Sequence, residues 1–182
     1  GTIVNTYLQI NPIQKLTLRT QFGANAHFRR TDKFTPEFYI DALEQSTLSN
    51  VSREMQEWLD WNWTNTATYI TTFAEKHNIN VMGGFTAERF AEFQSKASRD
   101  DVPNNMDQMQ EVNAGTQNQK SEGKTAYSTL VSYLGRVMYN YDNRYYLTAS
   151  IRADGSSRFP KGNKYAIFPS VSASWRIISE SF

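Results

Sequence analysis

The sequence predicts an all-β fold, an antiparallel up-and-down meander of about seven long strands. Apolar and polar residues alternate with a period of two along several long stretches. Short turns alternate with longer polar connections. Aromatic residues make up 14% of the 182 residues, although the chain is polar on average. This balance favours strands with one apolar and one wet face over a compact α/β core.

The composition excludes several classes of function. The formal net charge is only +1, from 19 Lys+Arg and 18 Asp+Glu, so nothing indicates a nucleic-acid partner. The absence of Cys excludes disulfides, thiolate zinc sites and cysteine nucleophiles. His27 and His77 lie far apart, and we interpret both as loop or lumen residues. We therefore expect no metal site, no cofactor and no enzymatic activity.

The elements follow from the alternation. The clearest strands are expected over residues 126–141, 144–153 and 166–177, with a tight turn at 141–144. Weaker patterns predict strands over 2–10, 15–28, 57–73 and 79–93. A short helix over 36–45 stays open, because Thr35 is a capping residue and Pro36 suits a first helical turn.

The connections are expected to alternate in length. Those at 11–14, 74–78 and 141–144 are short, whereas 29–55 and 94–124 are predicted as long polar loops and 154–165 as an intermediate one. Short turns on one side and long loops on the other are typical of outer-membrane barrels. Strands of about ten or more residues are long enough to cross a bilayer at a tilt.

Alternation alone also fits a soluble β-sandwich, so the aromatic positions matter. Aromatic residues gather at the ends of expected strands, as in the girdles of membrane barrels. They are Tyr139, Tyr141, Tyr145 and Tyr146 at one turn, and Trp58, Trp61 and Trp63 beside a long loop. A soluble β-sandwich carbohydrate-binding module is the alternative, and a glycoside hydrolase fragment is a third option, for which no carboxylate pair stands out.

Residues 133–182 carry a specific resemblance, over about a quarter of the chain. The elements are Leu134-Gly135-Arg136-Val137, Asp142-Asn143-Arg144-Tyr145, Leu147-Thr148-Ala149-Ser150-Ile151-Arg152, Asp154-Gly155-Ser156-Ser157-Arg158-Phe159 and Phe168-Pro169-Ser170 through Ser174-Trp175-Arg176. This pattern resembles the barrel region of the SusC/RagA family of TonB-dependent outer-membrane transporters of the Bacteroidetes.

The resemblance implies a large transmembrane barrel of about 22 strands filled by a plug. It also implies a TonB box, a SusD-like lipoprotein partner, a place in the bacterial outer membrane, and import of oligosaccharides or peptides. Residues 1–182 are then expected to be a partial barrel domain without plug, TonB box or signal peptide. Because such a slice has open sheet edges and an apolar face, we expect the isolated chain to associate.

Candidate binding residues follow from the polar face and the aromatic clusters. Arg136, Arg152 and Arg176 fall on the polar faces of three successive strands, as a basic stripe or as scattered ion pairs. Trp58 is a candidate for stacking on a sugar ring, whereas Trp61 and Trp63 share a face that suits a lipid-facing girdle.

Two further clusters are interpreted as structural. Residues Asp154, Gly155, Ser156, Ser157, Arg158 and Phe159 form a family-signature turn, expected to be architectural rather than substrate-binding, with Arg158 able to pair with Asp154. The oxygen-rich cluster of Asp100, Asp101, Asn104, Asn105 and Asp107 suits calcium but lacks EF-hand spacing, so a solvated loop is expected.

Overall fold

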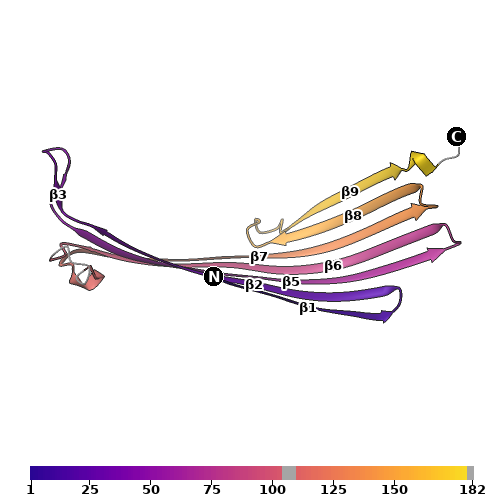
Figure 1. Ribbon diagram of the computed structural model, residues 1–182, viewed down its shortest axis with the longest axis horizontal. Coiled ribbons are helices and arrows are strands. Elements are labelled where there is room, and N and C mark those ends of the chain that lie inside the picture. Colours follow the sequence, from indigo (N-terminus) through magenta and orange to yellow (C-terminus); the bar gives the residue numbers. More distant parts are fainter. Residues whose placement is uncertain (104–109, 180–182) are drawn as a thin grey trace. The chain divides into compact units, whose positions relative to one another are not determined.

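The computed structural model describes residues 1–103 and 110–179 and is built almost entirely of strands (Figure 1). The strands are β1 (Thr2–Ile13), β2 (Leu16–Thr35), β3 (Phe38–Tyr39), β4 (Gln45–Ser46), β5 (Asn50–Phe73), β6 (His77–Asp100), β7 (Gln117–Tyr141), β8 (Tyr145–Ser156) and β9 (Tyr165–Trp175). Two single-turn 3₁₀ helices are described, η2 (Val112–Ala114) and η3 (Ile177–Ser179). In the described part of the chain, no helix is both long and apolar enough to cross a membrane.

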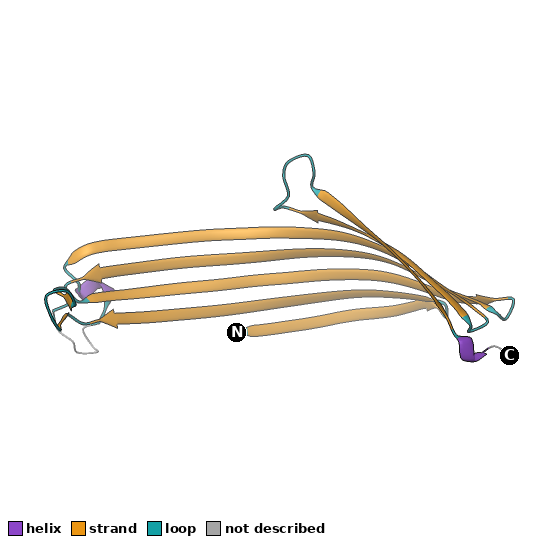
Figure 2. Cartoon of the chain, turned by 90° about the horizontal axis from the view of Figure 1, so that it is seen from above, coloured by secondary structure: helices purple, strands orange, loops and turns teal. Residues whose placement is uncertain are grey.

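Seven strands form one sheet in the order β1-β2-β5-β6-β7-β8-β9, and β3 pairs with β4 in a separate hairpin. Each strand of the large sheet is therefore hydrogen-bonded to its neighbours along the chain, apart from the inserted hairpin. In Figure 2 the loops connect the ends of neighbouring strands. The predicted meander of about seven strands is confirmed.

The chain divides into two compact units that share the long strands. The turn-end unit contains Ile3–Asn25, Asp60–Phe90 and the chain from Ser128 onward. The loop-end unit contains Gly1–Thr2, Ala26–Leu59 and Ala91–Tyr127. Each unit is described separately below.

The pairing of β7, β8 and β9 fixes which side chains share a face of the turn-end unit. Directly paired residues in antiparallel strands point to the same side of the sheet. One side therefore carries the row Val137–Ala149–Val171, and the other carries Arg136–Ser150–Ser170. This register confirms the predicted sorting for Val131, Tyr133, Val137, Leu147, Ile151, Val171 and Trp175 on one face and for Arg136 and Arg152 on the other.

The short turns owe their shape to left-handed backbone conformations. Asp142 and Asn143 have φ values of 52° and 54°, and the Arg144 N–H donates to the Tyr141 carbonyl at 2.9 Å. Positive φ at both central residues is characteristic of the hairpin turns that match strand twist, and Asp and Asn tolerate it well. The turn between β5 and β6 repeats the geometry at Ala74 and Glu75. The predicted tight turn at 141–144 is thus confirmed.

The loop-end unit corrects three expectations. The long loops predicted at 29–55 and 94–124 are wrong in extent, because β2 runs to Thr35, β5 begins at Asn50, β6 runs to Asp100 and β7 begins at Gln117. The optional helix over 36–45 is absent, since this segment contains β3, a bend and the start of β4. The Asp41 carboxylate accepts the N–H groups of Leu43 and Glu44, each at 2.7 Å, which closes a tight turn instead of a helix.

Few side chains in the described residues are buried. Val51, Ala91 and Val102, all in the loop-end unit, are the buried apolar residues, and none of the described side chains is fully enclosed. In the turn-end unit, by contrast, apolar side chains such as Val171, which is 72% exposed, cover one face of the sheet. A β-sandwich would bury that face against a second sheet. The sandwich alternative is therefore wrong.

Candidate functional site

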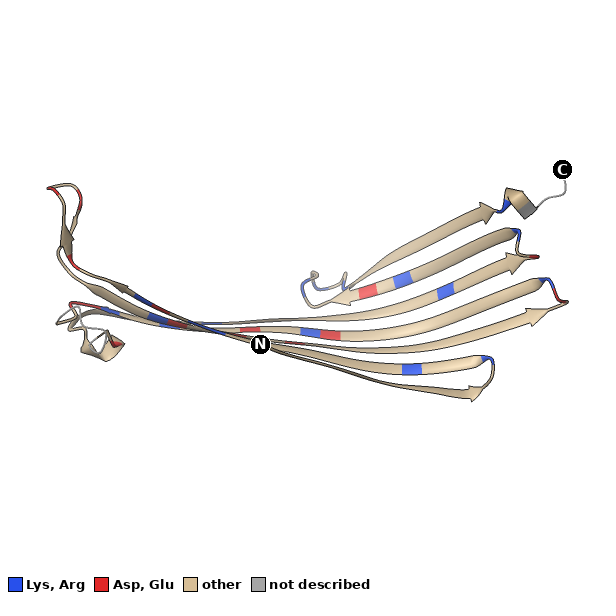
Figure 3. Ribbon diagram, viewed as in Figure 1, with Lys and Arg blue, Asp and Glu red and all other residues tan. Residues whose placement is uncertain are grey.

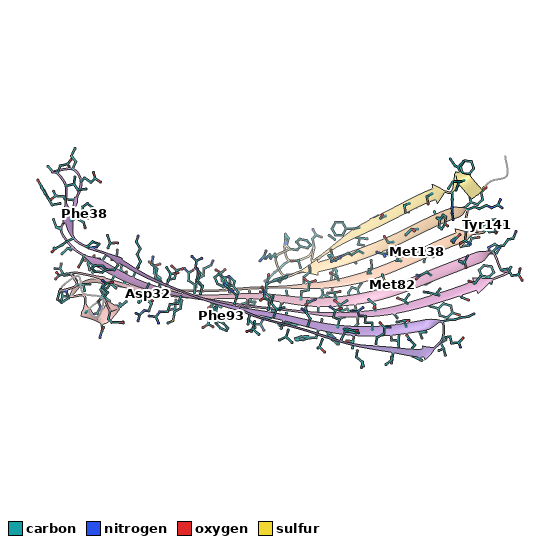
Figure 4. All side chains as sticks on the ribbon, in the orientation of Figure 1. Asp32, Phe38, Met82, Phe93, Met138 and Tyr141 are labelled. Carbon is teal, nitrogen blue, oxygen red and sulfur yellow. The ribbon has the colours of Figure 1, made fainter. Side chains whose placement is uncertain are left out.

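The apolar face of the turn-end unit carries an unbroken row of rings beside the short turns. We call it the turn row: Phe73, His77, Tyr141, Tyr145 and Trp175, each the terminal residue of its strand from β5 to β9. Successive ring centroids lie 4.6, 5.0, 6.3 and 6.4 Å apart. The His77 Nδ1 is 2.7 Å from the Tyr139 hydroxyl, so the imidazole is tied to the row. Tyr141 is labelled at the end of β7 in Figure 4.

A second aromatic row crosses the same face further along the strands. It consists of Phe22, Trp61, Trp63, Phe85 and Tyr133, from β2 to β7. Ring centroids are 6.3 Å apart for Phe22 and Trp61, 6.2 Å for Trp63 and Phe85, and 5.4 Å for Phe85 and Tyr133. The indole N–H of Trp63 donates to the Thr20 hydroxyl at 2.9 Å. A ring with one polar tip is the kind of side chain that favours a membrane interface.

The spacing between the two rows matches a bilayer. Tyr133 and Tyr141 are eight residues apart on β7, or roughly 27 Å along a strand. A strand tilt of about 40° reduces this to about 21 Å along the membrane normal, close to the ~25 Å apolar band of membrane barrels. Between the rows on this face, β7 and β8 carry Val137, Leu147 and Ile151, and Gly135 has no side chain, whereas Tyr139 adds a further ring beside the turn row.

The opposite face is mixed: it carries two of the predicted arginines and several serines, together with Leu134, Met138 and Phe168. Arg152 is held by the Asp154 carboxylate at 2.6 Å and donates to the Ser132 hydroxyl at 3.3 Å. Arg136 is exposed beside Ser150, and its guanidinium forms no ion pair or hydrogen bond with another described residue. The two arginines of the predicted basic stripe therefore differ, because the charge of Arg152 is neutralised by Asp154 whereas Arg136 is exposed to the solvent. Figure 3 shows a blue segment within β7 and another within β8.

The other two predicted candidates lie elsewhere. Arg176 follows the last residue of β9, and its backbone N–H donates to the Arg144 carbonyl at 2.8 Å, so it belongs to the turns. Trp58 lies in the loop-end unit, half-buried, with its ring 5.3 Å from that of His27. Trp58 therefore belongs to a different unit from Arg136 and Arg152.

The signature segment is partly strand. Asp154, Gly155 and Ser156 complete β8, so only the residues from Ser157 onward leave the sheet. The Ser157 hydroxyl accepts the Thr129 N–H at 2.9 Å, and the Ser156 hydroxyl accepts the Arg158 N–H at 3.2 Å. These bonds agree with an architectural role. The expected Arg158–Asp154 pair is replaced by the Arg152–Asp154 pair.

Gly155 has a steric reason to be glycine. A Cβ at this position would lie 2.6 Å from a carbon of the Tyr165 ring, which packs across the glycine. The cross-strand pairing of the two residues places that ring on the apolar face. Tyr165 thereby continues the second row onto β9. Sequence reasoning missed this contact, although a glycine opposite an aromatic residue at matched strand positions was the available signal.

The loop-end unit is held by polar networks. Arg53 contacts Asp32 at 2.5 Å and Glu111 at 3.0 Å, and Asp32 also contacts Arg30 at 2.7 Å. The hydrogen bond from Arg53 is the main cause that lowers the pKa of Asp32 below its ordinary value. Asp32 is labelled in Figure 4 among these side chains.

Asp100 and Asp101 of the oxygen-rich cluster, which was expected to be a solvated loop, accept hydrogen bonds from neighbouring residues. The Asn50 amide donates to Asp100 at 2.6 Å and lowers its pKa, with help from Asn118. Asp101 is bonded by the Thr116 hydroxyl and the Gln117 amide. No group of three or more metal-type side chains occurs in the residues that the structure describes. Asn104, Asn105 and Asp107 lie outside those residues.

Comparison with known proteins shows what this arrangement is similar to. No family model matches the sequence. The TonB-dependent receptor P39 of Formosa agariphila is 27% identical over 187 residues, which cover 100% of this chain and 17% of that protein. The TonB-dependent receptor SusC of Bacteroides thetaiotaomicron is 48% identical over 66 residues, or 35% of this chain and 7% of SusC.

The solved structures agree. The RagAB peptide transporter matches with a TM-score of 0.86 at 27% identity, over 98% of this chain and 20% of that one. The open-open state of the RagAB peptide importer gives the same TM-score at 28% identity. This chain therefore spans about a fifth or less of the length of these proteins. The matches in sequence and structure, together with the two-faced sheet, identify the chain as a SusC/RagA-like segment of a TonB-dependent transporter.

Proposed function

We propose that the protein containing this chain is an active importer of the outer membrane, and that the turn-end unit is part of its barrel wall. The carrying observation is the apolar face bounded by the two aromatic rows, opposite a face with Arg136, Arg152 and serines. A wall of this kind separates lipid from a polar lumen. The matched proteins, which are named receptors and transporters, support this role.

The wall itself performs no chemistry in this proposal. TonB supplies the energy for import through parts of the protein beyond this segment. A separate SusD-like lipoprotein captures the substrate at the extracellular mouth. The substrate is an oligosaccharide or a peptide. The RagAB structures, which are named for peptide transport, support the peptide option.

Arg136 is the wall residue that we propose to face the transported substrate or the plug. Its guanidinium is exposed and unpaired among the described residues, in contrast to Arg152, which Asp154 neutralises. Trp58 and the signature residues 154–159 are proposed to act on structure, since Trp58 packs on His27 and the signature serines bond backbone.

Deletion of the gene for the whole protein, followed by growth on a single nutrient, tests this function. We expect slower growth on one class, peptides or oligosaccharides, and normal growth on free amino acids and monosaccharides. Restoration by the wild-type gene but not by one with an inactivated TonB box supports active import. Unchanged growth and uptake for both classes would overturn the proposal, as would recovery of the protein outside the outer-membrane fraction.

A further inference from the structure

Every short turn of the turn-end unit carries a basic side chain. Lys15 lies between β1 and β2, Lys76 between β5 and β6, Arg144 between β7 and β8, and Arg176 directly after β9. We call these four residues the basic rim. Figure 3 shows blue segments at the short turns of this unit. The recurrence at every turn makes the rim a feature of the whole edge of this unit.

The turns of the rim are joined to each other. The Asp142 N–H donates to the Lys76 carbonyl at 2.8 Å, and the Arg176 N–H donates to the Arg144 carbonyl at the same distance. These backbone bonds connect the edge from β6 to the end of β9. The cations are thereby held side by side by backbone geometry.

Positive charge is in excess along this edge. The turns contain two carboxylates, Glu75 and Asp142, against the four cations of the rim. Asp142 is shared, lying 3.7 Å from the Lys76 ammonium and 3.4 Å from the Arg144 guanidinium. Lys76 remains 55% exposed in this arrangement. Lys15, Lys76 and Arg176 are exposed, so their positive charge is open to an external anion.

The neighbouring turn row sets the depth of the rim in a membrane. Aromatic rings of this kind lie at the level of the lipid headgroups. Three of the four rim residues are next to the turn row in sequence: Lys76 precedes His77, Arg144 precedes Tyr145 and Arg176 follows Trp175. An anion at this depth, next to apolar side chains, is the phosphate of a phospholipid.

We propose that the basic rim binds the phosphate groups of anionic phospholipids in the membrane leaflet at the short-turn side. This inference rests on the proposed function, because it requires the turn-end unit to lie in a membrane. Basic residues at a membrane surface gain electrostatic attraction to anionic lipid, and each is worth about a fivefold change in affinity. The aromatic row keeps the acyl chain against the wall while the cations hold its headgroup.

Native mass spectrometry tests whether the rim binds anionic lipid. The full-length transporter is titrated with phosphatidylglycerol or phosphatidylcholine, and the amount of bound lipid is compared. We expect phosphatidylglycerol to bind more tightly, and Lys76→Gln with Arg176→Gln to weaken it by roughly twentyfold. The matched control is Lys161→Gln with Lys164→Gln, which removes the same charge from the β8–β9 connection of the same unit. A charge-conserving variant, Lys76→Arg with Arg176→Lys, should retain the preference.

Two results would overturn the proposal that the basic rim binds anionic phospholipids. Equal affinity of the wild-type protein for both lipids would show that anionic charge is not recognised. An equal loss in the rim variant and in the control would show a general charge effect. Failure of the proposed function is distinguishable, because a protein outside the membrane would miss the outer-membrane fraction, whereas a membrane protein without lipid preference would reach it.

Discussion

Residues of β2, β5, β6 and β7 occur in both the turn-end and the loop-end unit, but the two units differ in how polar and apolar residues are distributed. In the turn-end unit, β7, β8 and β9 place nearly all polar residues on one face, which also carries Leu134, Met138 and Phe168, and leave the other face apolar. In the loop-end unit, β2 carries Arg29, Arg30, Asp32 and Lys33 nearly in succession, so both faces are charged. A strand needs strict alternation only where its two faces meet different environments. The difference fits the proposed barrel wall, in which one side of the turn-end unit would meet lipid and the loop-end unit would meet water.

The largest effect concerns the chain by itself. Its apolar face has no cover from a second layer, and β1 and β9 are unpaired edges of the sheet. Both features drive association in water. We expect the isolated chain to form oligomers or aggregates in light scattering without detergent, and to disperse when detergent covers the apolar face. A stable monomer without detergent would break the comparison, because this face would then tolerate water as the loop-end unit does.

Charge placed on either face of one strand should separate the two environments. Val171 and Ser172 are neighbours on β9 and point to opposite faces. In the full-length protein, Val171→Arg should lower barrel stability by roughly 2–4 kcal/mol, because a cation near the bilayer midplane is costly. Ser172→Arg is the matched control and should change it little. Urea unfolding in liposomes measures both, and equal losses would argue against a lipid-facing side.

The sequence predicted the turn-end unit well for a physical reason. Where the two faces of a strand meet different environments, the type of residue at each position is constrained, so the alternation over 126–141 and 144–153 identified the strands, the turn and the faces together. The loop-end strands lack that constraint, and segments such as 94–100 were therefore interpreted as loop. Charged and amide side chains there bond across strands, as Asn50 does to Asp100.

The candidate residues were predicted less well than the fold. Arg136, Arg152 and Arg176 share a sequence pattern, yet only the pairing of strands shows that Arg152 meets Asp154 and that Arg176 belongs to the turns. Contacts between distant strands, such as Phe22 with Trp61, likewise depend on register that no local pattern encodes. Residue type was therefore visible in the sequence, whereas its partner was not.

A smaller effect is expected where the second row crosses β8. Gly155→Ala would place a methyl group against the Tyr165 ring and displace it, at a cost of about 1–3 kcal/mol. Gly135→Ala is the control, since its Cβ would lie 3.5 Å from the nearest atom, Ile151 Cγ2. Thermal unfolding of the full-length protein compares them. In the double variant with Tyr165→Ala, the Gly155→Ala substitution should no longer lower the stability. If it still does, contact with the Tyr165 ring is not the cause.

The smallest effect belongs to the ion network of the loop-end unit. Because hydrogen bonding from Arg53 lowers the pKa of Asp32, this carboxylate contributes stability above its ordinary pKa of 3.8 and loses it as the pH falls below that value. Hydrogen exchange near Asp32 should therefore be constant from pH 7 to pH 4, after correction for intrinsic rates, and increase at lower pH. Asp32→Asn should exchange faster at pH 7 and show a weaker change below pH 4. If the ion network does not stabilise the unit, the corrected exchange rates of the wild-type protein and of Asp32→Asn will be equal. Burial of Val51 and Ala91 would then be the main stabilising contribution to the loop-end strands.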